Sequence, residues 1–140
     1  LKTASADRVL EIGTGSGYAA AVLSRVAAEV FSIETVVPLA EDAKKAIEDL
    51  GYTNVHLRTG DGTKGWPEAA PFDGILVSAG APVVPESLVS QLASGGRLVI
   101  PVGDRLNQSL LRITRTSEGK LVEEHLAIVR FVPLVGDEGW

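Results

Sequence analysis

Cysteine and methionine are both absent from this chain, and aromatic residues make up only 5% of its 140 positions. Without cysteine the chain has no disulfide framework, thiol nucleophile or cysteine-based zinc site, and nothing else in it implies a metal. No apolar run comes close to the roughly 18 residues that a membrane span requires, and no signal-peptide pattern opens the chain. We therefore expect a cytoplasmic protein that binds neither a membrane nor a metal. Because methionine is missing at position 1 and the first strand is expected almost at once, we also expect a piece of a longer product.

Positive charge is in the minority as well. The 13 basic residues are outnumbered by 18 acidic residues, which gives a formal net charge of −5. No basic block stands out, so nucleic acid is not an expected partner. The hydrophobic content of 45% and the length suit one α/β domain spanning residues 1–140, which is large enough to bury a core.

The most informative stretch is a glycine-rich turn near the start of the chain. An apolar run at residues 9–12 ends in the alternating glycines Gly13, Gly15 and Gly17, and an alanine-rich helical segment follows at once. Glycine permits the backbone angles of such a tight turn and leaves room for a ligand beside the main chain. The N–H groups that open the next helix then face whatever occupies the turn. This strand, turn and helix predict a loop that binds a nucleotide cofactor.

The spacing of the turn leaves more than one cofactor open. Gly15, Gly17 and Ala20 satisfy the G-x-G-x-x-A pattern of dinucleotide binding, so a nicotinamide-dependent oxidoreductase is compatible with it. The chain has no Tyr-x-x-x-Lys pair or suitably placed histidine for proton transfer, which disfavours that interpretation. Glu11, an acid just before the first glycine, favours a methyl-donor loop instead. The alternative for Glu11 is a polar residue at a strand end without a role.

Two further acids follow expected strands. Glu34 lies about twenty positions beyond the turn, where a carboxylate can accept hydrogen bonds from the ribose hydroxyls. Asp61 stands between Gly60 and Gly62, which let the chain bend and leave a lone carboxylate that can accept a hydrogen bond from an adenine amine. The alternatives are a solvated acid at a strand end for Glu34 and an ordinary Asp-Gly turn for Asp61.

Periodicity and turn residues place strands and helices along the chain. Strands are expected at residues 8–12, 30–33, 54–59, 72–78, 97–102, 109–115 and 121–132, and helices at 17–28, 38–50 and 85–92. Tyr18, Val22 and Val26 form one stripe on the first helix, and the second helix is expected to serve as scaffold. The alternation predicts an open, mostly parallel sheet with an antiparallel C-terminal hairpin. Ligands bind such sheets at the carboxyl ends of the strands.

The whole pattern resembles the protein-L-isoaspartate (D-aspartate) O-methyltransferase family from about Asp7 to Gly136. The glycine turn at residues 9–18 is typical of many S-adenosylmethionine-dependent methyltransferases. Two stretches are much narrower, namely Gly-Asp-Gly at 60–62 followed by Gly-Trp-Pro at 65–67, and Arg-Phe-Val-Pro-Leu at 130–134. The segments at residues 70–75, 79–82 and 95–103 resemble the family too.

The resemblance implies a Rossmann-like S-adenosylmethionine-dependent methyltransferase fold, with helices on both faces of the sheet and an unusual order of its last two strands. It also implies a repair enzyme that moves a methyl group from S-adenosylmethionine to the α-carboxyl group of L-isoaspartyl residues in damaged proteins and peptides. The implied donor-binding residues are Glu11, Gly13, Thr14, Gly15, Ser16, Gly17, Glu34, Asp61 and Gly62. The implied substrate-binding residues are Ala79, Gly80, Ala81, Pro82, Val129, Arg130, Phe131, Val132 and Pro133.

The implied chemistry needs few catalytic side chains, and we assign none. A carboxylate is already ionised at neutral pH, so the methyl transfer requires alignment and exclusion of water and no general base. His56 and His125 lie alone in expected strands and suit packing or surface roles.

The family pattern is also incomplete in this chain. Family members carry an amino-terminal helical region with a serine or threonine segment at the acceptor site, and only residues 1–6 precede the domain here. A donor-binding core without turnover is therefore a second hypothesis. A methyltransferase for a small molecule or nucleic acid is a third, which the segment 130–134 disfavours; the acidic charge adds to the case against nucleic acid.

Overall fold

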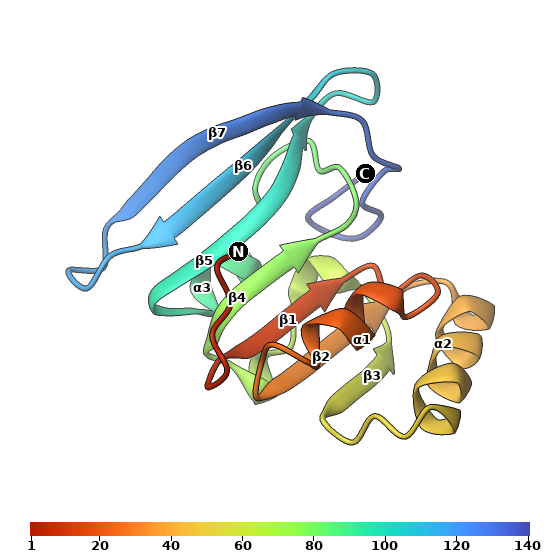
Figure 1. Cartoon of the computed structure of the whole chain (residues 1–140). Helices are drawn as coiled ribbons and strands as arrows, with labels where there is room; N and C mark the ends of the chain where they lie inside the picture. The colour runs from red at the N-terminus through yellow and green to blue at the C-terminus, as the bar shows by residue number, and fades with distance from the viewer.

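Seven strands form a single sheet in the computed structural model of this chain, which describes residues 1–140 (Figure 1). The strands are β1 (Arg8–Ile12), β2 (Glu29–Glu34), β3 (Val55–Thr59), β4 (Phe72–Val77), β5 (Leu92–Gly103), β6 (Gln108–Arg115) and β7 (Leu121–Val129). Their order across the sheet is β3-β2-β1-β4-β5-β6-β7. The strands β1 to β5 are parallel, and β6 and β7 complete the sheet as an antiparallel hairpin. The predicted open sheet with an antiparallel C-terminal hairpin is therefore confirmed.

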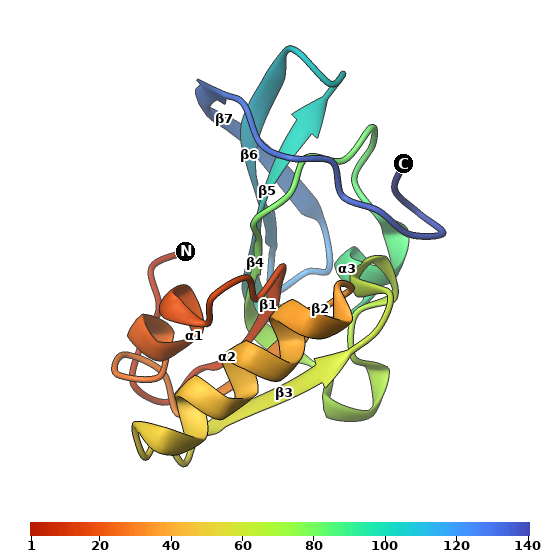
Figure 2. The same cartoon turned by 90° about the vertical axis from the view of Figure 1, so that its right-hand side faces the viewer.

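Short helices cover parts of both faces of the sheet. They are α1 (Tyr18–Leu23), α2 (Val37–Asp49) and α3 (Glu86–Ser90), and the 3-10 turns η1 (Gly62–Lys64) and η2 (Pro67–Ala69) lie between β3 and β4. Figure 2 shows α1 and α3 on opposite sides of the sheet, with α2 beside α1. None of these helices has both the length and the apolar character that crossing a membrane requires.

The largest differences from the sequence-based boundaries are at the end of α1 and the start of β5, each for a local reason, and β7 ends at Val129, three residues earlier than expected. The helix α1 ends at Leu23 and does not continue to residue 28. Beyond it, the side-chain amide of Asn54 donates hydrogen bonds to three carbonyl groups within residues 24–28, which therefore need no further helical partners. The strand β5 begins at Leu92, five residues earlier than expected, because Leu92 pairs with Phe72 before the register shifts.

The two faces of the sheet bury different sets of side chains. On the α3 face, 17 buried hydrophobic residues form one core. On the α1 face, the buried cluster has four members, Val9, Ala20, Ala27 and Val30. Glu11 and Ser32 alternate with Val9 and Val30 along β1 and β2, so their side chains also point toward the α1 face. The α1 face therefore buries polar groups beneath the turn that follows β1.

Candidate functional site

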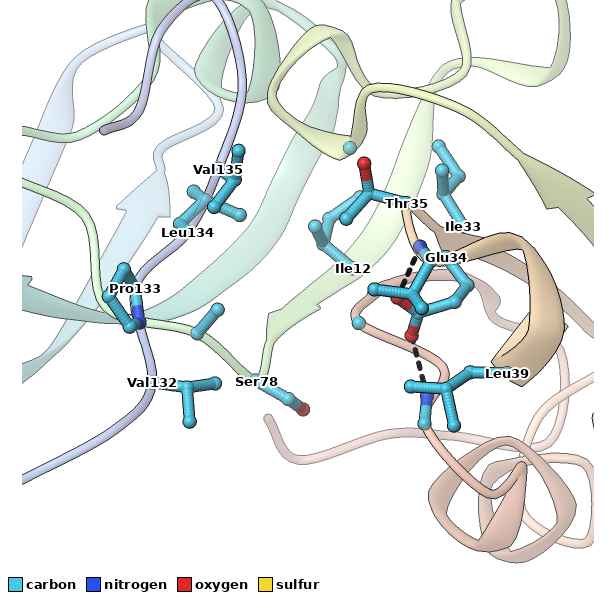
Figure 3. A pocket seen from close by; sticks show the side chains of 15 residues that line it. Ile12, Ile33, Glu34, Thr35, Leu39, Ser78, Val132, Pro133, Leu134 and Val135 are labelled. Atoms are coloured by element: carbon cyan, nitrogen blue, oxygen red, sulfur yellow. Dashed lines mark hydrogen bonds between the residues drawn. The ribbon is translucent and has the colours of Figure 1, made fainter.

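A cavity of about 310 Å³ opens at the carboxyl ends of the parallel strands (Figure 3). Its walls come from the ends of β1 and β2, the start of α2, η1, the segment after β4 and the C-terminal segment. The lining residues are Ile12, Gly13, Gly15, Ile33, Glu34, Thr35, Val36, Leu39, Gly62, Ser78, Ala79, Val132, Pro133, Leu134 and Val135. The volume lies near the lower end of the range of small-molecule sites, about 300–1,000 Å³. The cavity thus lies at the edge of the sheet where a ligand is expected.

Glu34 joins the glycine turn to β2 at one wall of the cavity. Its Oε2 atom accepts a hydrogen bond from the N–H of Gly15 at 2.8 Å, and its Oε1 atom accepts one from the N–H of Val36 at 3.0 Å. Gly15 has a φ of 53°, a conformation that suits glycine. Because a carboxylate oxygen can accept more than one hydrogen bond, Glu34 keeps acceptor capacity toward the cavity. These contacts are compatible with the predicted binding of ribose hydroxyls.

Glu11 lies behind the glycine turn and does not line the cavity. Its Oε2 atom accepts a hydrogen bond from the Oγ of Ser32 at 2.6 Å, while its buried Oε1 atom has no partner. The Oγ of Ser32 is also 2.6 Å from the Oγ1 of Thr14, which belongs to the turn. Burial raises the pKa of Glu11 to about 7, the bond from Ser32 opposes that rise, and the charge of Glu34 adds to it. A carboxyl group that titrates near neutral pH therefore lies under the turn.

Asp61 is not the lone carboxylate that the Gly-Asp-Gly stretch predicts. Its Oδ1 atom accepts hydrogen bonds from the N–H and the hydroxyl of Thr63 at 2.9 and 2.6 Å, and its Oδ2 atom accepts one from the N–H of Asp137 at 2.9 Å. Burial raises the pKa of Asp61, but these hydrogen bonds, with a smaller contribution from Lys64, outweigh burial and hold the pKa below its usual value. The carboxylate thus caps η1 and ties the C-terminal segment to it, and only the neighbouring Gly62 lines the cavity. Contact of Asp61 with an adenine amine stays a prediction.

The segment after β4 pairs with the C-terminal segment through its main chain. Gly80 donates its N–H to the carbonyl of Val132 at 2.7 Å, and its carbonyl accepts the N–H of Leu134 at 2.8 Å. Figure 3 shows Val132 and Pro133 across the cavity from Glu34. The segment that the resemblance assigns to the substrate therefore faces the wall assigned to the donor.

The cavity gathers part of each predicted residue set. From the donor set it is lined by Gly13, Gly15, Glu34 and Gly62, and from the substrate set by Ala79, Val132 and Pro133. Ser16 and Gly17 line a separate groove between α1 and α2. The remaining predicted residues that do not line the cavity are Glu11, Thr14, Asp61, Gly80, Ala81, Pro82, Val129, Arg130 and Phe131. The ligand contacts of all these residues stay predictions.

Several lining residues are not among the predicted site residues, and most of them are apolar: Ile12, Ile33, Thr35, Val36, Leu39, Ser78, Leu134 and Val135. An apolar residue at a strand end, such as Ile12, carries no sequence signal that separates a cavity wall from core packing. Leu39 shows that α2 is more than scaffold, because its first turn forms part of the wall. Leu134 and Val135 directly follow the predicted substrate segment, so extending that segment along the chain would have found them.

The two histidines lie away from the cavity. The ring of His56 stacks on Phe31 with 4.7 Å between centroids and lies 3.3 Å from a carboxylate oxygen of Glu29. His125 lies 3.3 Å from Glu123 on the exposed strand β7. Both positions agree with the predicted packing and surface roles. No group of three or more acidic or histidine side chains is arranged to hold a metal ion.

Known protein sequences are similar to this chain over its whole length. The family profile described as Protein-L-isoaspartate(D-aspartate) O-methyltransferase matches residues 1–139. A protein-L-isoaspartate O-methyltransferase of Pelotomaculum thermopropionicum is 59% identical over 140 residues, which are the whole of this chain and 61% of that protein. The chain thus spans about three fifths of the length of this curated relative.

Solved structures share the architecture. A protein-L-isoaspartate O-methyltransferase structure matches with a TM-score of 0.89 and 38% identity over 97% of this chain and 44% of that one. A Plasmodium falciparum structure described as a protein-L-isoaspartate O-methyltransferase in complex with S-adenosyl-L-homocysteine matches with a TM-score of 0.77 and 26% identity, over 94% of this chain and 67% of that one. The predicted Rossmann-like methyltransferase fold is therefore confirmed. Since the family profile extends over nearly every residue, the chain belongs to the protein-L-isoaspartate O-methyltransferase family.

Proposed function

We propose that this chain forms the S-adenosylmethionine-binding part of a repair methyltransferase for L-isoaspartyl residues in damaged proteins and peptides. The observation that carries the proposal is the single cavity in which the glycine turn and Glu34 lie across from Val132 and Pro133. Membership of the family supports the activity. The S-adenosylhomocysteine in the Plasmodium falciparum structure supports the donor.

The lining residues fit the proposed donor. Gly13 and Gly15 place bare main chain at the wall, so a ligand can approach it closely. Glu34 offers carboxylate oxygens for ribose hydroxyls at the end of β2. Ile33 and Leu39 flank Glu34 in Figure 3 and give an apolar surface suited to a flat heterocycle.

In the proposed reaction, the chain aligns the donor with the acceptor carboxylate and excludes water from the site. S-adenosylmethionine, when bound, would supply a methyl group on a cationic sulfur, and the acceptor carboxylate oxygen would take this methyl group while the electron pair of the carbon–sulfur bond stays on sulfur. Because the carboxylate is ionised at neutral pH, no side chain has to remove a proton. The turn held by Glu34 would orient the donor, and the apolar wall at Val132 and Pro133 would exclude water.

Transfer of a labelled methyl group to a synthetic peptide tests the activity. One peptide contains an L-isoaspartyl residue, and its matched control has ordinary aspartate at the same position. We expect label on the isoaspartyl peptide, as an ester that base hydrolyses, and none on the control. Equal labelling of both peptides, or labelling of a nucleic acid in their place, would contradict the proposed substrate.

A second candidate is a donor-binding core that does not turn over by itself. It is favoured by the fact that the chain spans only 61% of its Pelotomaculum thermopropionicum relative. Calorimetric titration with S-adenosylhomocysteine, with NADH as the control ligand, separates the candidates. Saturable binding of S-adenosylhomocysteine without methyl transfer supports the second candidate, whereas stronger binding of NADH would indicate an oxidoreductase.

Glu34→Ala should weaken binding of S-adenosylhomocysteine by about 1–3 kcal/mol, because it removes a buried charged acceptor. It also frees the N–H of Gly15, so the turn loses an anchor as well. The matched control is Glu41→Ala, which removes an exposed acid from α2 without touching the cavity. The ribose assignment would fail if both variants bound the ligand as tightly as the unchanged chain.

We further propose that residues 1–140 act as one S-adenosylmethionine-binding domain in the cytoplasm, without nucleic acid, membrane or metal partners. One sheet runs through the chain, and a single core joins residues as distant as Leu10 and Leu134. The net charge of −5 disfavours nucleic acid. Coincident unfolding transitions by two spectroscopic probes would support one domain, and cell fractionation tests the location.

A further inference from the structure

An acid lies beneath the glycine turn at a position where its strand neighbours are apolar. Glu11 is 0% exposed and stands between Leu10 and Ile12 in β1. Its Oε1 atom has no hydrogen-bond partner. An ionised carboxylate loses its hydration at such a position, and an aliphatic side chain of similar size would stabilise the fold better. Packing alone therefore does not explain the acid.

Two short hydrogen bonds connect Glu11 to the turn. Ser32 lies opposite Glu11 in the register of β1 and β2, and its hydroxyl donates to Glu11 Oε2 at 2.6 Å. The Oγ1 of Thr14 is 2.6 Å from the Oγ of Ser32, and it is the donor of this bond because the proton of Ser32 is directed to Glu11. Thr14 separates Gly13 from Gly15, and both glycines line the cavity. The connection therefore runs from the sheet to the middle of the turn.

The turn contains residues that are costly to order. Gly13, Gly15 and Gly17 have φ values of 94°, 53° and 86°, and glycine loses more conformational freedom on folding than other residues. Two consecutive residues of the turn are nevertheless tied to β2, since Thr14 bonds to Ser32 and the N–H of Gly15 bonds to Glu34. The side chains of Thr14, Ser32 and Glu34 therefore restrict the backbone of the turn, which its glycines alone would leave flexible.

We propose that Glu11 is a positioning residue, which holds the glycine turn in its donor-binding conformation through Ser32 and Thr14 and does not itself contact the donor. The identity of the donor rests on the proposed function, whereas the hydrogen-bond connection stands on its own geometry. An ionised carboxylate accepts a stronger hydrogen bond than a neutral one, so the hold on the turn tightens as Glu11 ionises.

The surroundings of Glu11 make this titration simple to interpret. The charged group that acts on it is Glu34, from the same side of β2 as Ser32. On β4 the residue opposite Glu11 is Leu76. The helix α1 contributes Tyr18 as its titratable residue, and that side chain is 76% exposed.

Two replacements of Thr14 separate its hydroxyl from its shape. Thr14→Val keeps the branched shape and removes the hydroxyl, whereas Thr14→Ser keeps the hydroxyl. In the chain without ligand, we expect the amide protons of Gly15 and Gly17 to exchange about fivefold faster in Thr14→Val than in the unchanged chain. Affinity for S-adenosylhomocysteine should fall about fivefold in the same variant. Thr14→Ser should match the unchanged chain in both measurements.

Glu11→Gln tests the ionisation. Between about pH 6 and about pH 8, the unchanged chain should gain affinity for S-adenosylhomocysteine relative to Glu11→Gln by about threefold, because glutamine cannot ionise. A purely structural role for Glu11 would shift both affinities together and leave their ratio constant with pH. Equal amide exchange in the unchanged chain, Thr14→Val and Thr14→Ser would overturn the proposal, as would a constant ratio. If exchange responds as expected and S-adenosylhomocysteine does not bind, the positioning role is supported and the proposed donor is wrong.

Discussion

On the α3 side of the sheet, 17 buried hydrophobic residues pack into one core, whereas the buried cluster on the α1 side has four members. The α1 side instead buries the hydroxyl of Ser32 and the carboxyl group of Glu11, both fully inaccessible to solvent. It also leaves apolar side chains exposed on α1 itself, with Val22 at 48%. One face therefore supplies most of the buried apolar surface, and the other places polar groups behind the cavity.

This difference indicates how the fold can tolerate a costly acid next to its site. Burial of apolar surface is the dominant favourable contribution to folding, and here it is concentrated on the α3 face. The α1 face can then keep groups that serve the turn at the expense of stability. If this is correct, core variants should change stability far more than ligand binding, and variants of Glu11 should change both.

The largest effect is expected for Leu98→Ala on the α3 face. Leu98 is 0% exposed and belongs to the large core, so its truncation removes apolar contacts and leaves a cavity. We expect the free energy of unfolding to fall by about 2–5 kcal/mol, measured by urea denaturation.

A matched pair of valines makes the comparison of faces direct. Val77→Ala changes the large core, and Val9→Ala makes the same change in the small cluster; the two valines are 2% and 0% exposed. The loss should be greater for Val77→Ala, because more of its surroundings are apolar side chains that cannot close the gap. If Val9→Ala lowered the free energy of unfolding as much as Val77→Ala or more, the two faces would not differ in how much their apolar packing stabilises the fold.

The next largest effect is expected for Glu11→Gln and depends on pH. The pKa of Glu11 rises from 4.5 to about 7 in the folded chain. The protonated form is therefore favoured by folding: its stability contribution is present below about pH 4.5 and is lost as pH rises through about 7. Relative to the unchanged chain, Glu11→Gln should be more stable at about pH 8 by up to about 3 kcal/mol, and little different at about pH 4.

Urea denaturation across this pH range measures the effect, with Glu41→Gln on exposed α2 as the control for loss of one negative charge. A constant difference between Glu11→Gln and the unchanged chain would mean that the pKa of Glu11 is the same in the folded and the unfolded chain, so that burial does not raise it. If Glu11→Gln is more stable than the unchanged chain but binds S-adenosylhomocysteine more weakly, then Glu11 serves the cavity at the expense of the stability of the fold.

Most of the sheet could be predicted from the sequence because buried parallel strands are continuous apolar runs between glycine and proline turns. The residues 8–12 matched β1 at both ends. The end of α1 could not be predicted, because it depends on Asn54, which lies some thirty residues away in the chain and supplies hydrogen bonds across the fold. The early start of β5 likewise depends on pairing with Phe72.

The candidate site was predictable where a residue type is chemically unusual at its position. Glycines at a strand end and Glu34 after β2 stand out against an apolar background, and both reach the cavity. The hydrogen bond from the N–H of Asp137 to the carboxylate of Asp61 could not be predicted, because it joins residues 76 positions apart in the sequence. The apolar wall of the cavity could not be predicted either, because isoleucine and leucine, as at Ile12 and Leu39, are also the residue types that fill the core.

The smallest effect is expected for Val22→Ser on α1, where the predicted stripe is exposed and consists of Tyr18 and Val22, because the helix ends before Val26. Val22 is 48% exposed, so the free energy of unfolding should change by no more than about 0.5 kcal/mol, measured by thermal or urea unfolding. Ala20→Ser on the same helix is the matched control: Ala20 is 0% exposed, and a hydroxyl there should cost about 1–3 kcal/mol. A cost above about 1 kcal/mol for Val22→Ser would mean that the stripe is covered in solution. A cost that grows with protein concentration would identify the cover as a second copy of this chain, and the α1 face would then gain its apolar burial from association and not from its own fold.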